Sequence, residues 1–127
     1  MTEHIVDTSV VLAYAFGETG SNVAENLITG AFISNVNFCE IISKLIDHGK
    51  SPDDAASTAA EFGLNVVDSD ARLAIAAAAL RASSRYLGLS LGDRFCLALA
   101  LQKGLPVYTA DKRWAGLSDV VDIRLIR

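Results

Sequence analysis

Short apolar segments alternate with longer segments of helical periodicity along this chain. Buried strands are predicted at residues 5–6, 31–33, 64–67 and 105–109, because each is a short apolar run next to polar or turn-forming residues. A last strand at residues 122–125 alternates polar and apolar positions, which is typical of a half-exposed strand. Short apolar strands separated by helices form a parallel sheet that helices cover on both faces. The sequence therefore predicts an α/β fold with a short central parallel sheet.

The helices are predicted from their caps and from apolar residues that recur every three or four positions. The clearest helix shows this spacing from Phe38 to Ile46 and stops at His48, and either Asn35 or Asn37 is expected to cap it. Helices are expected at residues 10–16, 23–28, 38–48, 51–62, 70–87 and 91–101, with a short helical turn at 111–114.

The helix that begins after Ser90 is expected to lie at the centre of the fold. Ser90 is a good N-cap, and Asp93 occupies the third helical position of a capping box. From Phe95 to Leu101 the segment is apolar on every face, which is typical of a buried helix. An ionised carboxylate at such a place is costly unless it is capped, paired or bound to a metal.

Length and composition set the size and class of the protein. A chain of 127 residues can bury one good core but is too short for two, so we expect one domain over residues 1–127. The hydrophobic share of 51% is high for a monomer, and no apolar run reaches the roughly 18 residues of a membrane span. This surplus predicts a protein partner or a homodimer and no membrane association.

The N-terminus and the cysteines indicate the compartment. No basic segment precedes the first apolar run, so no secretory signal is expected and the location is expected to be cytoplasmic. Cys39 and Cys96 are far apart and have no C-x-x-C spacing, so both are expected to be reduced, buried thiols.

Charge is divided unevenly along the chain, although the net charge is only −4. Residues 1–71 carry 2 Lys and no Arg against 11 acids, a balance of −9. Residues 72–113 carry 7 basic groups against 2 acids, a balance of +5, and residues 114–127 balance at zero. A basic segment whose two acids both begin helices is consistent with a polyanion that approaches a metal site, and an ordinary solvated face is the alternative.

Four acids are candidates for a shared site. Asp7 and Asp111 each follow a strand, Glu40 lies in the first turns of the helix after the second strand, and Asp93 begins the central helix. The carboxyl ends of parallel strands lie on one edge of a sheet, where ligands bind. Carboxylates gathered there repel one another unless a cation neutralises them, and oxygen ligands without His or Cys favour Mg²⁺ or Mn²⁺.

Each of these acids also has a purely structural alternative. Asp7 and Asp111 can cap the helices that follow them, and Asp93 can close the capping box with Ser90. Glu40 can pair with Lys44 one turn later, or close a capping box with Asn37. Capping and metal binding do not exclude each other, because a carboxylate at a helix N-terminus has room for both.

Segments 5–9, 89–94 and 109–114, together with Glu40, resemble the PIN domain, and most of all the VapC toxins of bacterial toxin–antitoxin pairs. The resemblance spans the whole chain and is most specific around Asp93 and Asp111. It implies an α/β/α sandwich, a ribonuclease that depends on Mg²⁺ or Mn²⁺, a homodimer, and inhibition by a cognate antitoxin. The acids that it implies for catalysis and metal binding are Asp7, Glu40, Asp93 and Asp111, supported by the hydroxyls of Thr109 and Ser9.

Under this hypothesis a divalent ion activates water and neutralises the phosphate, which suits a chain with only two histidines. Asp7 and Asp93 are then the principal ligands. The cations next to the acids, Arg94, Lys112 and Arg113, are candidates for contacts with flanking phosphates of RNA, and plain solvent exposure is their alternative.

Two other functions fit a domain of this size. A two-component receiver domain also has an acid after its first strand, as Asp7 is here. Asp68 after the third strand is then the candidate phosphorylated residue, and Thr109 is the Thr that such domains have after the fourth strand. This reading leaves Asp93 and Asp111 unexplained. A PIN-like module that binds RNA or protein without cleaving is the other alternative.

Overall fold

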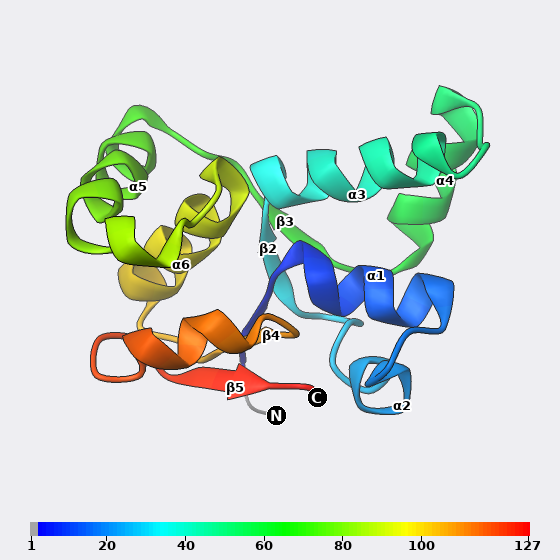
Figure 1. The fold of residues 1–127 in the computed structure, drawn as a ribbon. Coiled ribbons are helices and arrows are strands. Elements are labelled where there is room, and N and C mark those ends of the chain that lie inside the picture. Colours follow the sequence, from blue (N-terminus) through cyan, green and yellow to red (C-terminus); the bar gives the residue numbers. More distant parts are fainter. Residues whose placement is uncertain (1–2) are drawn as a thin grey trace.

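A five-stranded parallel sheet forms the centre of the structure (Figure 1). The computed structural model describes residues 3–127. The strands follow the order β3-β2-β1-β4-β5, and every neighbouring pair is parallel. Their bounds are β1 (Ile5–Val6), β2 (Phe32–Ser34), β3 (Asn65–Val67), β4 (Val107–Thr109) and β5 (Ile123–Leu125). The five predicted strands are all present, and the α/β class is confirmed.

Helices cover both faces of this sheet (Figure 1). One face carries α1 (Thr8–Phe16), α2 (Ser21–Ala24), α3 (Asn35–Asp47) and α4 (Pro52–Glu61), and the other carries α5 (Ala71–Ser83) and α6 (Leu91–Lys103). Two 3-10 helices, η1 (Arg85–Leu87) and η2 (Lys112–Leu117), follow α5 and β4.

Strand β1 shows how the sheet divides the core in two. Ile5 and Val6 are both fully buried, and successive side chains of a strand point to opposite faces. Ile5 belongs to the apolar cluster of α5 and α6, whereas Val6 belongs to the cluster of α1 and α3. Burial on both faces explains why the central strands are apolar throughout instead of alternating.

Helix α6 is the buried helix that the sequence predicts. Ser90 accepts a hydrogen bond from the Asp93 amide and Asp93 accepts one from the Ser90 amide, which completes the capping box. Residues 96–100 are all buried. Arg94 is buried as well, although the sequence suggested an exposed cation at this position.

Three helix boundaries differ from the prediction. Helix α3 is capped by Ser34, whose Oγ accepts from the Asn37 amide, and not by Asn35 or Asn37. Helix α5 ends at Ser83 instead of about residue 87, because Ser84 leaves helical geometry and bonds its side chain back to the Leu80 carbonyl. Helix α2 is shorter than expected, since turns over residues 25–31 lead the chain into β2.

The two cysteines differ in burial. Both are free, as expected, and Cys96 is buried in α6. Cys39 is exposed, contrary to the prediction, because Ile41 and Leu45 form the buried face of α3.

The strand order excludes the receiver alternative. Receiver domains have the flavodoxin-like order 2-1-3-4-5, in which the first and third strands are neighbours. Here β3 lies at the edge beside β2, and β1 pairs with β2 and β4. Asp68, which follows β3, is therefore separated from Asp7 by a whole strand.

No helix within residues 3–127 is both long enough and apolar enough to cross a membrane.

Candidate functional site

Four acidic side chains meet in one pocket at the carboxyl edge of the sheet. The pocket has a volume of about 190 Å³. It is lined by Asp7, Thr8, Ser9, Leu12, Asn37, Glu40, Asp93 and Asp111. The acids come from the end of β1, from α3, from the first turn of α6 and from the end of β4, so the parallel topology brings together residues more than a hundred positions apart.

Asp7 lies deepest in this pocket and is held by hydroxyl groups. Ser9 Oγ donates to its Oδ1 at 2.5 Å, and Thr109 Oγ1 donates to its Oδ2 at 2.6 Å. The Val10 amide also donates to Oδ1, at 3.2 Å. Asp7 therefore caps α1, which is the structural role that the sequence offered as an alternative. The side chain is thus fixed by donors that carry no net charge.

Burial raises the pKa of Asp7 to about 6, because the ionised form loses its hydration. Its hydrogen bonds from Ser9, Thr109 and Val10 act in the opposite direction, and the nearby charge of Asp93 raises the pKa further. The protein therefore holds in place a carboxylate whose charge it does not neutralise.

Glu40 is fixed by residues of two helices. Its Oε1 accepts from Thr8 Oγ1 and from Asn37 Nδ2, both at 2.8 Å. Asn37 Nδ2 also donates to the Gly92 carbonyl at 3.1 Å and so connects α3 with α6. A Cβ at position 92 would lie 2.6 Å from Cδ of Glu40, so the carboxylate packs against the bare backbone of α6. No ion pair links Glu40 to Lys44 within residues 3–127, which leaves that alternative unsupported.

Asp111 lies at the rim and is paired with a cation. Arg113 Nη2 donates to its Oδ2 at 2.6 Å and Arg113 Nε donates to its Oδ1 at 3.0 Å. These hydrogen bonds lower the pKa of Asp111. Arg113 Nη2 also lies 4.0 Å from Oδ2 of Asp93, so one guanidinium balances part of the charge on two acids.

The oxygen donors of the pocket have the chemistry that a hard divalent cation prefers. As the side chains stand, no three His, Cys, Asp or Glu residues among those described form a group that could hold a metal ion. Arg113 occupies Asp111, and Asp93 is engaged with its own helix start. The donor set therefore fits Mg²⁺ or Mn²⁺ in kind, and a bound ion would require the carboxylates to come closer together.

Sequence reasoning missed two polar residues of the pocket. Thr8 and Asn37 hold Glu40, whereas the sequence suggested only a capping role for Asn37 and none for Thr8. The signal available in the sequence was the spacing of Asn37 and Glu40, three positions apart on one helix face.

The three cations proposed for phosphate contacts have different surroundings. Lys112 is exposed, and Arg113 is engaged with Asp111. Arg94 does not line the acidic pocket at all: it is 7% exposed and lies in a second pocket, where Nη1 donates to the Ala77 carbonyl.

Comparison with family models decides which family has this arrangement. The model described as PIN domain matches residues 4–120, nearly the whole chain. The chain belongs to the PIN domain family. Comparison of this chain with curated proteins finds no match.

Solved structures with the same fold come from toxin–antitoxin systems. A toxin–antitoxin complex from Klebsiella pneumoniae is 20% identical, with a TM-score of 0.74 and coverage of 98% of both chains. A DNA-bound VapBC complex from Salmonella typhimurium is 22% identical, with a TM-score of 0.75 and coverage of 100% of both chains. A VapC toxin of Mycobacterium tuberculosis, described as cleaving the sarcin-ricin loop, is 22% identical with a TM-score of 0.76, covering 94% of this PIN domain and 98% of that chain. At these identities the likeness establishes a shared fold.

Proposed function

We propose that this PIN domain is a metal-dependent endoribonuclease toxin that a cognate VapB-type antitoxin neutralises. The observation that carries the proposal is the convergence of Asp7, Glu40, Asp93 and Asp111 on one pocket. Like charges collect in this way where a cation is to be bound. Parallel topology brings the ends of β1 and β4 to one edge, but it does not require an acid at all four of these positions.

The solved relatives support the substrate class and the partner. Two of them are toxin–antitoxin complexes, and a third is described as a toxin that cleaves the sarcin-ricin loop, which is RNA. By analogy with them we propose that this PIN domain acts on RNA and is bound by an antitoxin. Both are found in the cytoplasm, so we propose the cytoplasm as its location.

Asp7 and Asp93 are the proposed principal ligands, and Asp111 and Glu40 complete the set around Mg²⁺, with Mn²⁺ as a substitute. When bound, such an ion supplies a nucleophilic water near neutral pH and neutralises charge on the phosphate. This accounts for hydrolysis by a pocket that contains no histidine.

The chain's own residues position these ligands. Thr109 and Ser9 donate to opposite oxygens of Asp7 and fix the plane of its carboxylate. Thr8 and Asn37 both bond Oε1 of Glu40, so Oε2 remains available to hold a water molecule or to accept its proton. This pattern fits a Glu40 that orients water beside the more deeply buried Asp7.

Homodimerisation is part of the proposal. Several large apolar side chains are more than half exposed, namely Ile75, Tyr86, Leu91 and Val120. An interface requires that such side chains form one contiguous patch, and these residues are the candidates for it.

RNA cleavage in the presence of Mg²⁺, compared with cleavage in EDTA, tests the activity. We expect Asp93→Asn to abolish cleavage without lowering the melting temperature of the metal-free protein, because the substitution relieves repulsion with Asp7. Asp70→Asn is the matched control: it removes a charge from the N-cap of α5, outside the pocket, and Asn caps equally well. Co-purification with the product of the adjacent open reading frame tests the antitoxin partner.

Full activity of purified Asp93→Asn, or cleavage by the wild type in EDTA, contradicts the metal-dependent mechanism. Metal-independent RNA binding without any cleavage favours the alternative of a silent PIN-like binding module.

A further inference from the structure

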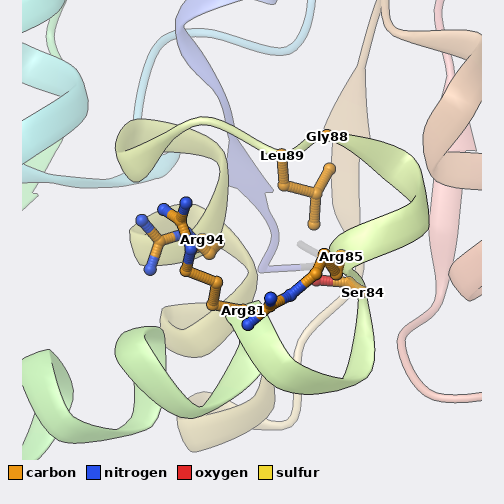
Figure 2. A pocket seen from close by; sticks show the side chains of 6 residues that line it. All are labelled: Arg81, Ser84, Arg85, Gly88, Leu89 and Arg94. Atoms are coloured by element: carbon orange, nitrogen blue, oxygen red, sulfur yellow. The ribbon is translucent and has the colours of Figure 1, made fainter.

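A second pocket, of about 200 Å³, lies between α5, η1 and the start of α6 (Figure 2). Its lining residues are Arg81, Ser84, Arg85, Gly88, Leu89 and Arg94. Three guanidinium groups and no carboxylate line it, which makes it the electrostatic opposite of the acidic pocket. We call it the arginine pocket.

Arg94 is the unusual member of this lining. Its side chain is 7% exposed, and among residues 3–127 its hydrogen bonding is limited to Nη1, which donates to the Ala77 carbonyl at 3.3 Å. Its Nε is buried and has no partner within the same residues. A buried cation without a carboxylate is costly, and each unmade hydrogen bond adds to that cost. An anion in the pocket would supply the opposite charge that Arg94 lacks.

Arg81 and Arg85 bring two further charges to the same pocket. Both are exposed, and neither forms an ion pair with any of residues 3–127. Guanidinium groups bind phosphate oxygens through two parallel hydrogen bonds, so several of them around one pocket favour a phosphate over a single carboxylate. Ser84 is buried and also lines the pocket.

The arginine pocket adjoins the acidic pocket through two direct connections. Asp93 and Arg94 are consecutive residues in the first turn of α6, so they leave the helix about 100° apart and face different pockets. Arg113 holds Asp111 and also donates from Nη1 to the Leu87 carbonyl at 3.1 Å, next to Gly88 of the arginine pocket. Residues 87–94 therefore connect two pockets of opposite charge.

We propose that the arginine pocket binds a phosphate group of the RNA substrate, on the strand that passes the acidic pocket. This inference rests on the proposed function and names how the substrate is held. A nucleic acid carries a phosphate at every nucleotide, so one strand can contact both pockets at once. An acidic side chain of a protein partner would not explain why the pockets adjoin. Attraction at the arginine pocket offsets the repulsion that any phosphate meets beside four carboxylates.

Binding of a short fluorescein-labelled single-stranded RNA, followed by anisotropy in EDTA, tests this assignment without any cleavage. We expect the Arg81→Gln/Arg85→Gln double variant to bind RNA about tenfold more weakly for each arginine that holds a phosphate in the wild type. The slope of log Kd against log salt concentration should fall by about 0.7 for each such arginine. Arg72→Gln is the control, because Arg72 is exposed on the same helix and does not line the pocket.

Arg94→Met separates binding from folding. Replacing an unpaired buried cation by an apolar side chain should raise the melting temperature while it weakens RNA binding. A purely structural arginine would lower the melting temperature and leave the affinity of the folded protein unchanged. Titration of the wild type with inorganic phosphate should shift the ¹⁵N resonance of Arg94 Nε.

The outcomes distinguish this proposal from the proposed function. Unchanged affinity and salt slope in the double variant overturn the arginine pocket, even if Mg²⁺-dependent cleavage is found. Weakened binding without any cleavage supports the pocket and contradicts the nuclease. A further outcome is that phosphate shifts the ¹⁵N resonance of Arg94 Nε while substitution of all three arginines leaves the RNA affinity unchanged. In that case another anion, such as an acidic segment of a protein partner, is the ligand, and the RNA assignment is wrong.

Discussion

Asp7 and Asp111 follow neighbouring strands of the sheet, yet the protein holds them in opposite ways. Asp7 is buried and receives hydrogen bonds from two hydroxyls and an amide, and its pKa is raised to about 6. Asp111 is partly exposed and receives hydrogen bonds from Arg113, which lower its pKa. Two carboxylates of one pocket thus differ in whether their charge is already balanced.

The difference shows what each kind of partner provides. Hydroxyl donors fix the geometry of Asp7 but leave its charge uncompensated, which is the condition under which a divalent cation gains most by binding. The guanidinium of Arg113 balances Asp111 and must withdraw before that carboxylate can join a metal. The buried side of the pocket would therefore gain more from a bound cation than the rim, where Arg113 already balances Asp111.

Asp7→Asn should have the largest effect on activity. Removing a partner that only orients a metal ligand costs about 10- to 100-fold, so removing a principal ligand should lower kcat/KM for Mg²⁺-dependent RNA cleavage by more than about 100-fold. Steady-state cleavage of an RNA substrate measures the loss. Cleavage within tenfold of the wild type would remove Asp7 from the ligand set.

The pH dependence of the stability of Asp7→Asn tests whether the charge of Asp7 is uncompensated in the folded protein. The carboxyl of Asp7 is neutral in both the folded and the unfolded protein at about pH 3, and at about pH 7 it is ionised in both, at the full cost of burial in the folded protein. The rise from 3.8 to about 6 corresponds to roughly 3 kcal/mol. The free energy of unfolding of the metal-free wild type should therefore fall by this amount, relative to Asp7→Asn, as the pH rises from about 3 to about 7.

Urea unfolding of both proteins in EDTA at the two pH values measures this difference. Saturating Mg²⁺ at pH 7 should abolish it, since the cation replaces the lost hydration. Parallel pH profiles of wild type and variant would show that Asp7 ionises in the folded protein as it does in an unfolded chain.

Thr109→Val tests the hydroxyls that hold Asp7. The variant loses the donor to Oδ2 of Asp7 and the acceptor for the Asp111 amide, so both halves of the pocket lose a support. We expect kcat/KM to fall about 10- to 100-fold and the pKa of Asp7 to rise further, because a hydrogen bond that lowers it is gone. Thr109→Ser keeps the hydroxyl and should stay near wild-type activity. Equal rates for the two variants would contradict a role for the hydroxyl.

The features visible in the sequence are those that depend on local order and topology. Apolar runs predict four strands, alternation of polar and apolar positions predicts the fifth, and the Ser90 capping box predicts the start of α6. The meeting of Asp7 and Asp111 follows from parallel strands whose ends share one edge. That Asp7 and Asp111 bind a metal together with Glu40 and Asp93 stays a prediction.

The contacts that sequence reasoning missed depend on how separate elements meet. Arg94 was a candidate for contact with RNA phosphates, with solvent exposure as the alternative, but α5 packs against α6 and buries it. The two donors to Glu40 come from α1 and α3, whose relative placement no local pattern specifies. Arg113 reaches Asp111 because a 3-10 turn begins between them, which a helical wheel does not represent.

Arg113→Gln gives the smallest expected effect and tests the rim directly. With the guanidinium gone, the pKa of Asp111 should rise towards its usual value, and a cation no longer competes with an arginine for that carboxylate. Ion pairs at exposed sites are weak, so the affinity for Mn²⁺, measured at pH 7 by electron paramagnetic resonance of the free ion, should increase only about two- to fivefold.

The chain offers a matched control for this last comparison. Arg124 pairs with Asp122 at the same spacing of two residues, with Nη2 2.9 Å from Oδ2, but on β5 and outside the acidic pocket. Arg124→Gln removes the same charge and an equivalent ion pair, so a general change in net charge would raise the Mn²⁺ affinity equally in both variants. A gain confined to Arg113→Gln means that Arg113 competes with the metal, whereas weaker Mn²⁺ binding in that variant would mean that Arg113 holds Asp111 ready for it.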